Sequence, residues 1–116
     1  MNSDPKRKRK KKQKKHSPSI IQRSEDWKKC YLCMLRYDDY SEKQYLETHH
    51  VIFGQGRREK SEADGLTVRL CREHHEEVHR DAGARQRLSE VAQKAYERTH
   101  SREQWMNRYK KNYRED

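Results

Sequence analysis

The sequence is poor in apolar residues. Only 29% of its 116 residues are hydrophobic, a single one is phenylalanine, and 41% are charged. A chain of this length and composition predicts one small domain with a thin core. No hydrophobic run is long enough for a signal peptide or a membrane span, which argues against secretion and membrane insertion. A core this thin usually needs a disulfide, a metal ion or a partner chain to stabilise it.

Cysteine is also scarce, and the number of cysteines is odd: Cys30, Cys33 and Cys71. Three thiols cannot all be paired within one chain. Without a secretory segment we expect a reducing intracellular compartment, where thiols are available as metal ligands. A metal ion is therefore the expected stabiliser of the fold.

Acidic residues are nearly missing from positions 1–15, which hold nine Lys/Arg and one Asp. The other residues carry 20 basic and 18 acidic side chains, so most of the net charge of +10 lies in this segment. Because like charges repel each other and bury nothing, residues 1–19 are predicted to be a disordered basic tail ahead of a domain at 20–116. Such a tail binds nucleic-acid phosphates without reading sequence; a solubility segment or a nuclear-address-like patch are the alternatives. The expected DNA contacts are Lys6, Arg7, Lys8, Arg9, Lys10, Lys11 and Lys12.

Two segments have the composition of β-strands. YLETHHVIF (45–53) and LTVRLC (66–71) are rich in aromatic and β-branched residues. The segment between them, GQGRREKSEADG, is predicted to be a flexible basic loop punctuated by glycine. Ahead of the strands, CYLC (30–33) has the spacing of a turn.

The last third of the chain is predicted to be helical. One helix is expected from Arg72 to about Asp81, with Gly83 breaking it. A helical extension is expected over about 84–113, and its last helix opens with SREQ at 101–104, which has the form of a capping box. The expected fold class is α+β.

The stretch CREHHEEVH places one thiol and three imidazoles within nine residues. A helix advances by about 100° per residue, so these groups fall into two pairs about a right angle apart. Cys71 and His74 face one way, and His75 and His79 face another. Since one tetrahedral ion cannot easily gather all four, the pattern predicts two metal sites.

The first pair completes a structural zinc site with the CYLC segment. Cys30, Cys33, Cys71 and His74 make a Cys₃His set, which is typical of closed, tetrahedral zinc. The set uses all three cysteines, and a redox-active C-x-x-C pair is the competing interpretation. The second pair, His75 and His79, needs a further ligand, for which His49 of ETHH is the candidate. Three imidazoles leave positions open on a divalent ion, which is typical of a catalytic centre.

The residues LETHHVIF, the loop after them and GLTVRLCREHHEEVH resemble the HNH (ββα-metal) endonuclease family, and most closely its small phage and prophage members with a zinc knuckle. The similarity covers about residues 30–113. It implies a small zinc-stapled ββα-metal (HNH) domain followed by C-terminal helices, with DNA as substrate and the bacterial cytoplasm as location. It also implies a structural Zn²⁺ and one catalytic divalent ion, which is Mg²⁺, Mn²⁺, Ni²⁺ or Zn²⁺.

The resemblance assigns roles to single residues. His50 matches the general base that accepts a proton from the attacking water, and His49, His75 and His79 match the ligands of the catalytic ion. Glu47 matches a catalytic carboxylate that orients or polarises the site. By analogy, Arg57 or Arg58 holds the scissile phosphate.

The sequence departs from the family pattern at the central asparagine, because no Asn lies between the two predicted strands. Asp64 or Gly65 stands about where it belongs, which leaves open how His50 is held. A second question concerns His49 and His50, because strand alternation sends neighbours to opposite faces. Both meet one phosphate only if the strand ends or twists there.

The function predicted from the sequence is metal-dependent endonucleolytic hydrolysis of DNA, by a phage or prophage product. Two alternatives remain. One is a non-catalytic zinc-binding DNA module, and the other is an accessory factor that acts with phage or host recombination or packaging proteins.

Overall fold

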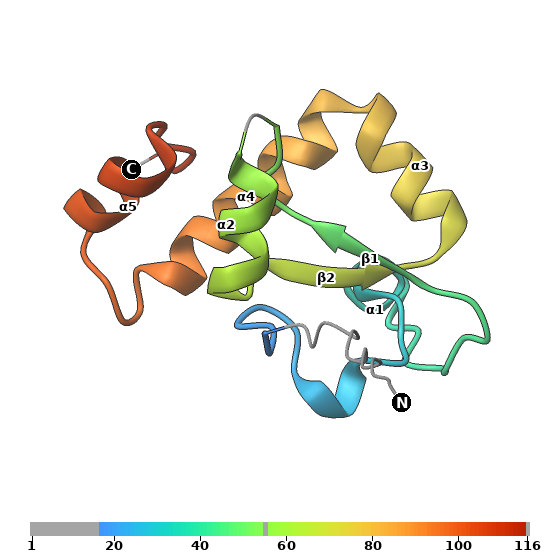
Figure 1. Cartoon of the computed structure of the whole chain (residues 1–116). Helices are drawn as coiled ribbons and strands as arrows, with labels where there is room; N and C mark the ends of the chain where they lie inside the picture. Colours follow the sequence, from blue (N-terminus) through green and yellow to red (C-terminus); the bar gives the residue numbers. More distant parts are fainter. Residues whose placement is uncertain (1–16, 55, 116) are drawn as a thin grey trace, which may run out of the picture.

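The computed structural model describes residues 17–54 and 56–115. Within them, a two-stranded antiparallel sheet is combined with five α-helices and one short 3-10 helix (Figure 1). The elements in chain order are η2 (Ser24–Asp26), α1 (Tyr31–Tyr37), β1 (Glu47–His50), α2 (Arg57–Asp64), β2 (Thr67–Leu70), α3 (Arg72–Arg80), α4 (Ala82–Tyr96) and α5 (Arg102–Tyr109). The predicted α+β class is confirmed. None of the helices in these residues is long and apolar enough to cross a membrane.

The sheet is shorter than the sequence predicted. β1 pairs with β2 from Glu47 opposite Leu70 to His50 opposite Thr67. Beyond His50, the Ser61 hydroxyl of α2 accepts from the Ile52 N–H at 3.1 Å and donates to the Ile52 carbonyl at 2.5 Å. Because a side chain occupies these backbone groups in place of a partner strand, β1 ends before them.

The segment predicted to be a flexible loop contains helix α2, so that prediction was wrong. Residues 57–63 are mostly good helix formers, and their charged side chains suit a solvated helix face. Gly56 and Gly65 flank the helix in left-handed conformations. Ser61 faces the interior and is completely buried. The flanking glycines predict a loop, but the run of helix formers between them decides the structure of this segment.

Helix α3 ends at Arg80, close to the predicted end at about Asp81, but Gly83 is not the residue that ends it. Gly83 lies in the first turn of α4. The break comes from Asp81, whose side chain accepts hydrogen bonds from the N–H groups of Gly83 and Ala84 and so caps α4. The capping box predicted for the last helix is confirmed at Ser101 and Gln104.

Helix α5 docks on α4 and α2 at one end of the molecule (Figure 1). Its Trp105 and Tyr109 are completely buried. Asp64 at the end of α2 accepts hydrogen bonds from Arg108 Nε and the Tyr109 hydroxyl, both at 2.5 Å. Asp64 therefore fastens the C-terminal helix to α2.

The segment after residue 16 runs along β2. The Ser19 hydroxyl donates to the Thr67 carbonyl at 2.6 Å, and the Ile20 N–H donates to the Gly65 carbonyl at 2.9 Å. Ser17 and Ser19, which lie within the predicted tail 1–19, thus contact the domain. The tail contacts predicted at residues 6–12 lie outside the described part of the chain.

Candidate metal centres

The first candidate centre joins the start of α1 to the start of α3. CYLC is not an isolated turn, since Cys30 caps α1 and Cys33 lies in its first turn, where the Cys33 N–H points at Cys30 Sγ at 3.4 Å. Cys71 is the N-cap of α3, and His74 lies one turn later. Both chain segments thus present ligands from helix N-termini, whose free N–H groups favour thiolates.

The geometry of this cluster fits a tetrahedral zinc ion. His74 Nδ1 lies 3.3 Å from Cys30 Sγ, 3.6 Å from Cys33 Sγ and 3.4 Å from Cys71 Sγ. A tetrahedron with Zn–S of about 2.3 Å and Zn–N of about 2.0 Å has a nitrogen–sulfur edge of about 3.5 Å. The three distances match that edge, so the predicted Cys₃His set is assembled and can hold a metal ion such as zinc.

Zinc binding at this cluster is coupled to the release of protons from the thiols. All three cysteines are free thiols. Burial raises the pKa of Cys33 to about 12, with further contributions from Cys30 and Cys71. Thiols that are protonated at neutral pH must lose protons to ligate zinc, so binding couples to proton release. Tyr37 of α1 stacks on the His74 ring at 5.9 Å and covers it.

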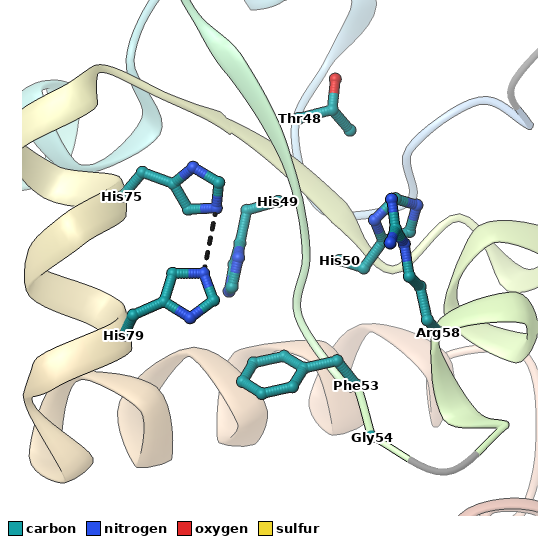
Figure 2. Close-up of a pocket in the computed structure, with 8 residues that line it drawn as sticks. All are labelled: Thr48, His49, His50, Phe53, Gly54, Arg58, His75 and His79. Atoms are coloured by element: carbon teal, nitrogen blue, oxygen red, sulfur yellow. Dashed lines mark hydrogen bonds between the residues drawn. The ribbon is translucent and has the colours of Figure 1, made fainter.

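The second candidate centre consists of the imidazoles of His49, His75 and His79. His49 projects from β1 toward the two histidines of α3 (Figure 2). The Nε2 atoms of His75 and His79 are 3.3 Å apart, and one ligand atom from each of the three rings lies within 4.8 Å of the others. Two nitrogen ligands on a tetrahedral zinc ion are also about 3.3 Å apart. The structure thus brings together the three residues that the sequence predicted.

The second centre differs from the first in being open on one side. His49 is only 3% exposed, and burial, followed by the neighbouring His75 and His79, lowers the pKa of His49 to about 3. Its ring is therefore neutral at pH 7, with a lone pair available to a cation. His79 is exposed and His75 is half-buried, so solvent reaches an ion held here.

Glu47 holds one of these ligands in place. The Nδ1–H of His75 donates to Glu47 Oε1 at 2.5 Å, which leaves His75 Nε2 beside His79. The Tyr45 hydroxyl donates to the other carboxylate oxygen, and this bond, followed by the one from His75, lowers the pKa of Glu47. The predicted carboxylate thus contacts a ligand, as outer carboxylates of metal sites do.

A cavity of about 370 Å³ adjoins the imidazoles. Besides the three histidines it is lined by His50 and Arg58, with Thr48, Phe53 and Gly54 completing the wall. His49 and His50 leave β1 on opposite sides, as alternation requires (Figure 2). The strand ends at His50, and both rings nevertheless border the same cavity. Of the two arginines that the sequence offered, Arg58 lines the cavity.

Sequence reasoning missed Glu62. His50 Nε2 lies 2.7 Å from Glu62 Oε1, so the carboxylate accepts a hydrogen bond from the ring. Glu62 lies in the segment that was predicted to be a loop, where no fixed contact was expected. The helical run of residues 57–63 was the signal that could have placed Glu62 on a rigid element.

Comparisons with known proteins identify one family. No curated protein and no solved structure matches the sequence. Residues 3–108 match a family described as a protein of unknown function, DUF968. This match spans the basic segment, both candidate metal centres and nearly all of α5. The chain belongs to the DUF968 family.

Proposed function

We propose that this protein is a metal-dependent endonuclease of the HNH (ββα-metal) type that hydrolyses phosphodiester bonds in DNA. The observation that carries the proposal is the convergence of His49, His75 and His79 at the edge of an open cavity that His50 and Arg58 also line. The two paired strands, which are connected through helix α2, are followed directly by α3, and the candidate ligands lie on β1 and α3. The resemblance of the motif and the basic residues 1–15 favour DNA as the substrate.

The donor set fits a divalent ion with open coordination positions. Three imidazoles suit Zn²⁺ or Ni²⁺, and the exposed side at His79 leaves room for a phosphate oxygen. When bound, such an ion supplies positive charge that stabilises the transition state of phosphodiester hydrolysis. The Cys₃His cluster lacks such an opening and serves the fold.

The other side chains around the cavity accept the proton, bind the phosphate and orient a ligand. His50 accepts the proton of the attacking water as general base; because its Nε2 is engaged by Glu62, Nδ1 is the nitrogen that remains for this. Arg58 binds the non-bridging oxygens of the scissile phosphate, for which a guanidinium is geometrically suited. Glu47 keeps His75 turned toward the ion through its bond to Nδ1.

The experiment that tests the proposal is plasmid nicking by the parent and by His50→Ala, with Mg²⁺, Mn²⁺, Ni²⁺ or Zn²⁺. We expect the parent to nick with at least one ion. His50→Ala should lose roughly 10²–10⁴-fold in rate, which is the usual contribution of a general base. Elemental analysis should show unchanged metal content. His100→Ala is the matched control, because His100 stacks on Tyr96 at 4.1 Å in a different part of the fold.

Three outcomes contradict parts of the proposal. Equal nicking by His50→Ala and the parent overturns the assignment of the base. A parent that retains DNA but nicks with none of the four ions favours a non-catalytic zinc-binding module. A parent that nicks only after phage or host proteins are added favours an accessory factor.

A further inference from the structure

On the side of the cavity next to α2, His50 bonds to Glu62, a contact that metal binding does not explain. Glu62 lies in the last turns of α2, and its Oε1 accepts from His50 Nε2 at 2.7 Å. The side chains are shielded, with 11% of His50 and 29% of Glu62 exposed. The second oxygen, Oε2, accepts from the Ser17 N–H at 3.3 Å. The carboxylate is therefore held at both oxygens and is not a solvated side chain that happens to lie near a ring.

The backbone that carries Glu62 is also fixed. Ser61, the preceding residue, is bonded to both backbone groups of Ile52, two positions beyond His50. Asp64, two positions later, is bonded to Arg108 and Tyr109 of α5. Contacts on both sides of Glu62 thus set the distance between α2 and the end of β1, and with it the position of the carboxylate.

A carboxylate at this place selects one form of the ring. It has acceptors only, so the neutral imidazole must carry its proton on Nε2 to bond with it. The lone pair is then on Nδ1, the nitrogen that can accept a proton from a water in the cavity. An imidazole without this partner can exchange protons between its two nitrogens and rotate about its side-chain torsions.

We propose that Glu62 is the positioning residue for His50, holding the ring in the Nε2–H tautomer with Nδ1 free for the reaction. Glu62 thereby braces His50, a task that an asparagine performs in the HNH pattern. Asp64, which stands near the position of that asparagine, instead bonds to α5. The catalytic consequence of this inference rests on the proposed role of His50 as general base. The tautomer itself does not depend on any catalytic activity.

The kinetic test uses two variants at position 62 and one on the same helix. Glu62→Gln keeps the size and polarity, but its amide can donate as well as accept and so imposes no tautomer. We expect Glu62→Gln and Glu62→Ala to lower kcat for plasmid nicking by roughly 10–100-fold, the usual effect of removing an outer partner of a site residue. KM should stay within about twofold of the parent. Glu59→Gln, an exposed carboxylate of α2, should match the parent.

A double variant separates positioning from a structural role. If Glu62 acts through His50, Glu62→Gln should have no further effect in a His50→Ala background, because residues that work as a unit are not additive. A structural role predicts the same loss in both backgrounds. Parent-like kcat in Glu62→Gln, or additive losses in the double variant, overturns the proposal.

A spectroscopic test makes the inference independent of nuclease activity. The ¹⁵N shifts of the His50 ring, assigned by their loss in His50→Gln, are measured in the zinc-loaded full chain at about pH 8, where histidine rings are normally neutral. We expect Nε2–H in the parent and in Glu59→Gln, and a mixture of tautomers in Glu62→Gln. Nδ1–H in the parent, or no change in Glu62→Gln, overturns the proposal. If the parent has the Nε2–H tautomer yet nicks no DNA, only the proposed function fails.

Discussion

At the scale of single residues, the imidazole cluster depends on which nitrogen of each ring points toward the others. Glu47 decides this for His75, because it accepts from Nδ1 and leaves Nε2 3.3 Å from the Nε2 of His79. Carboxylates that bond to a ligand in this way orient the ring and raise its basicity. Glu47 and His49 are two residues apart in β1 and so lie on the same side of the strand. One short strand therefore supplies the candidate ligand His49 and the carboxylate that supports the candidate ligand His75.

Removing this support should weaken the second centre alone. We expect Glu47→Ala to lower the affinity for Ni²⁺ or Zn²⁺ at the imidazoles by roughly 10–100-fold, because His75 loses its fixed orientation. The zinc of the Cys₃His cluster should remain. Calorimetric titration of protein that already holds this zinc measures the effect. Glu76→Gln is the control, since Glu76 is an exposed neighbour of His75. Unchanged affinity in Glu47→Ala would show that the His75–Glu47 bond does not matter for binding.

The ligand residues could be predicted from the sequence because helix geometry alone separates them. In CREHHEEVH, a regular helix turns His74 by about 100° or more from both His75 and His79, and α3 contains all three, with Cys71 as its N-cap. The partners of these residues could not be predicted in the same way. The contact of Glu62 with His50 depends on how α2 packs against the end of β1, and no local pattern records that packing.

At the scale of elements, the segment from β1 to β2 is where the prediction and the structure differ most. Gly54, Gly56 and Gly65 suggested a flexible loop, yet Gly56 and Gly65 flank a helix of eight residues. Propensity favoured that helix, but its length is too short for an amphipathic pattern to be distinctive. The long helix α4 shows the opposite case, since Leu88, Ala92 and Tyr96 recur at helical spacing and are buried.

Gly65 should be far more sensitive to substitution than Gly56. Both have positive φ, +74° and +79°, so alanine costs about 1–2 kcal/mol of strain at either position. A Cβ at position 65 also collides with the carbonyl oxygen of Pro18, whereas a Cβ at position 56 has no atom within 4 Å. We expect Gly65→Ala to lower the free energy of unfolding by about 1–3 kcal/mol more than Gly56→Ala does, through overpacking.

Urea unfolding of the two zinc-loaded variants measures this difference directly. The pair is matched in backbone conformation, so the difference reports the packing of the N-terminal segment on β2. Equal midpoints and equal slopes would mean that residues 18–20 do not lie against Gly65 in solution.

At the scale of the whole molecule, the two candidate centres differ in how they are connected to the core. The hydrophobic core is small, and the Cys₃His cluster connects the start of α1 to the start of α3. Structural zinc contributes about 10–16 kcal/mol of apparent binding free energy at neutral pH. That range matches the entire stability of a small domain, about 5–15 kcal/mol. The imidazole cluster has one exposed member, His79, so an ion bound there could leave without opening the core.

Removing one ligand from each centre should therefore have opposite consequences. Cys33 is buried in the core cluster, so Cys33→Ala should lose zinc and with it the cooperative thermal transition and the near-ultraviolet circular dichroism. His79→Ala should keep one zinc per chain and a midpoint within a few degrees of the parent, about the effect of 1 kcal/mol or less, while losing the second ion and nicking. Elemental analysis and thermal melts in the presence of a weak chelator compare the two variants. Cooperative unfolding in zinc-free Cys33→Ala would mean that the apolar core is sufficient by itself, and unfolding of His79→Ala would mean that the rim ion is structural as well.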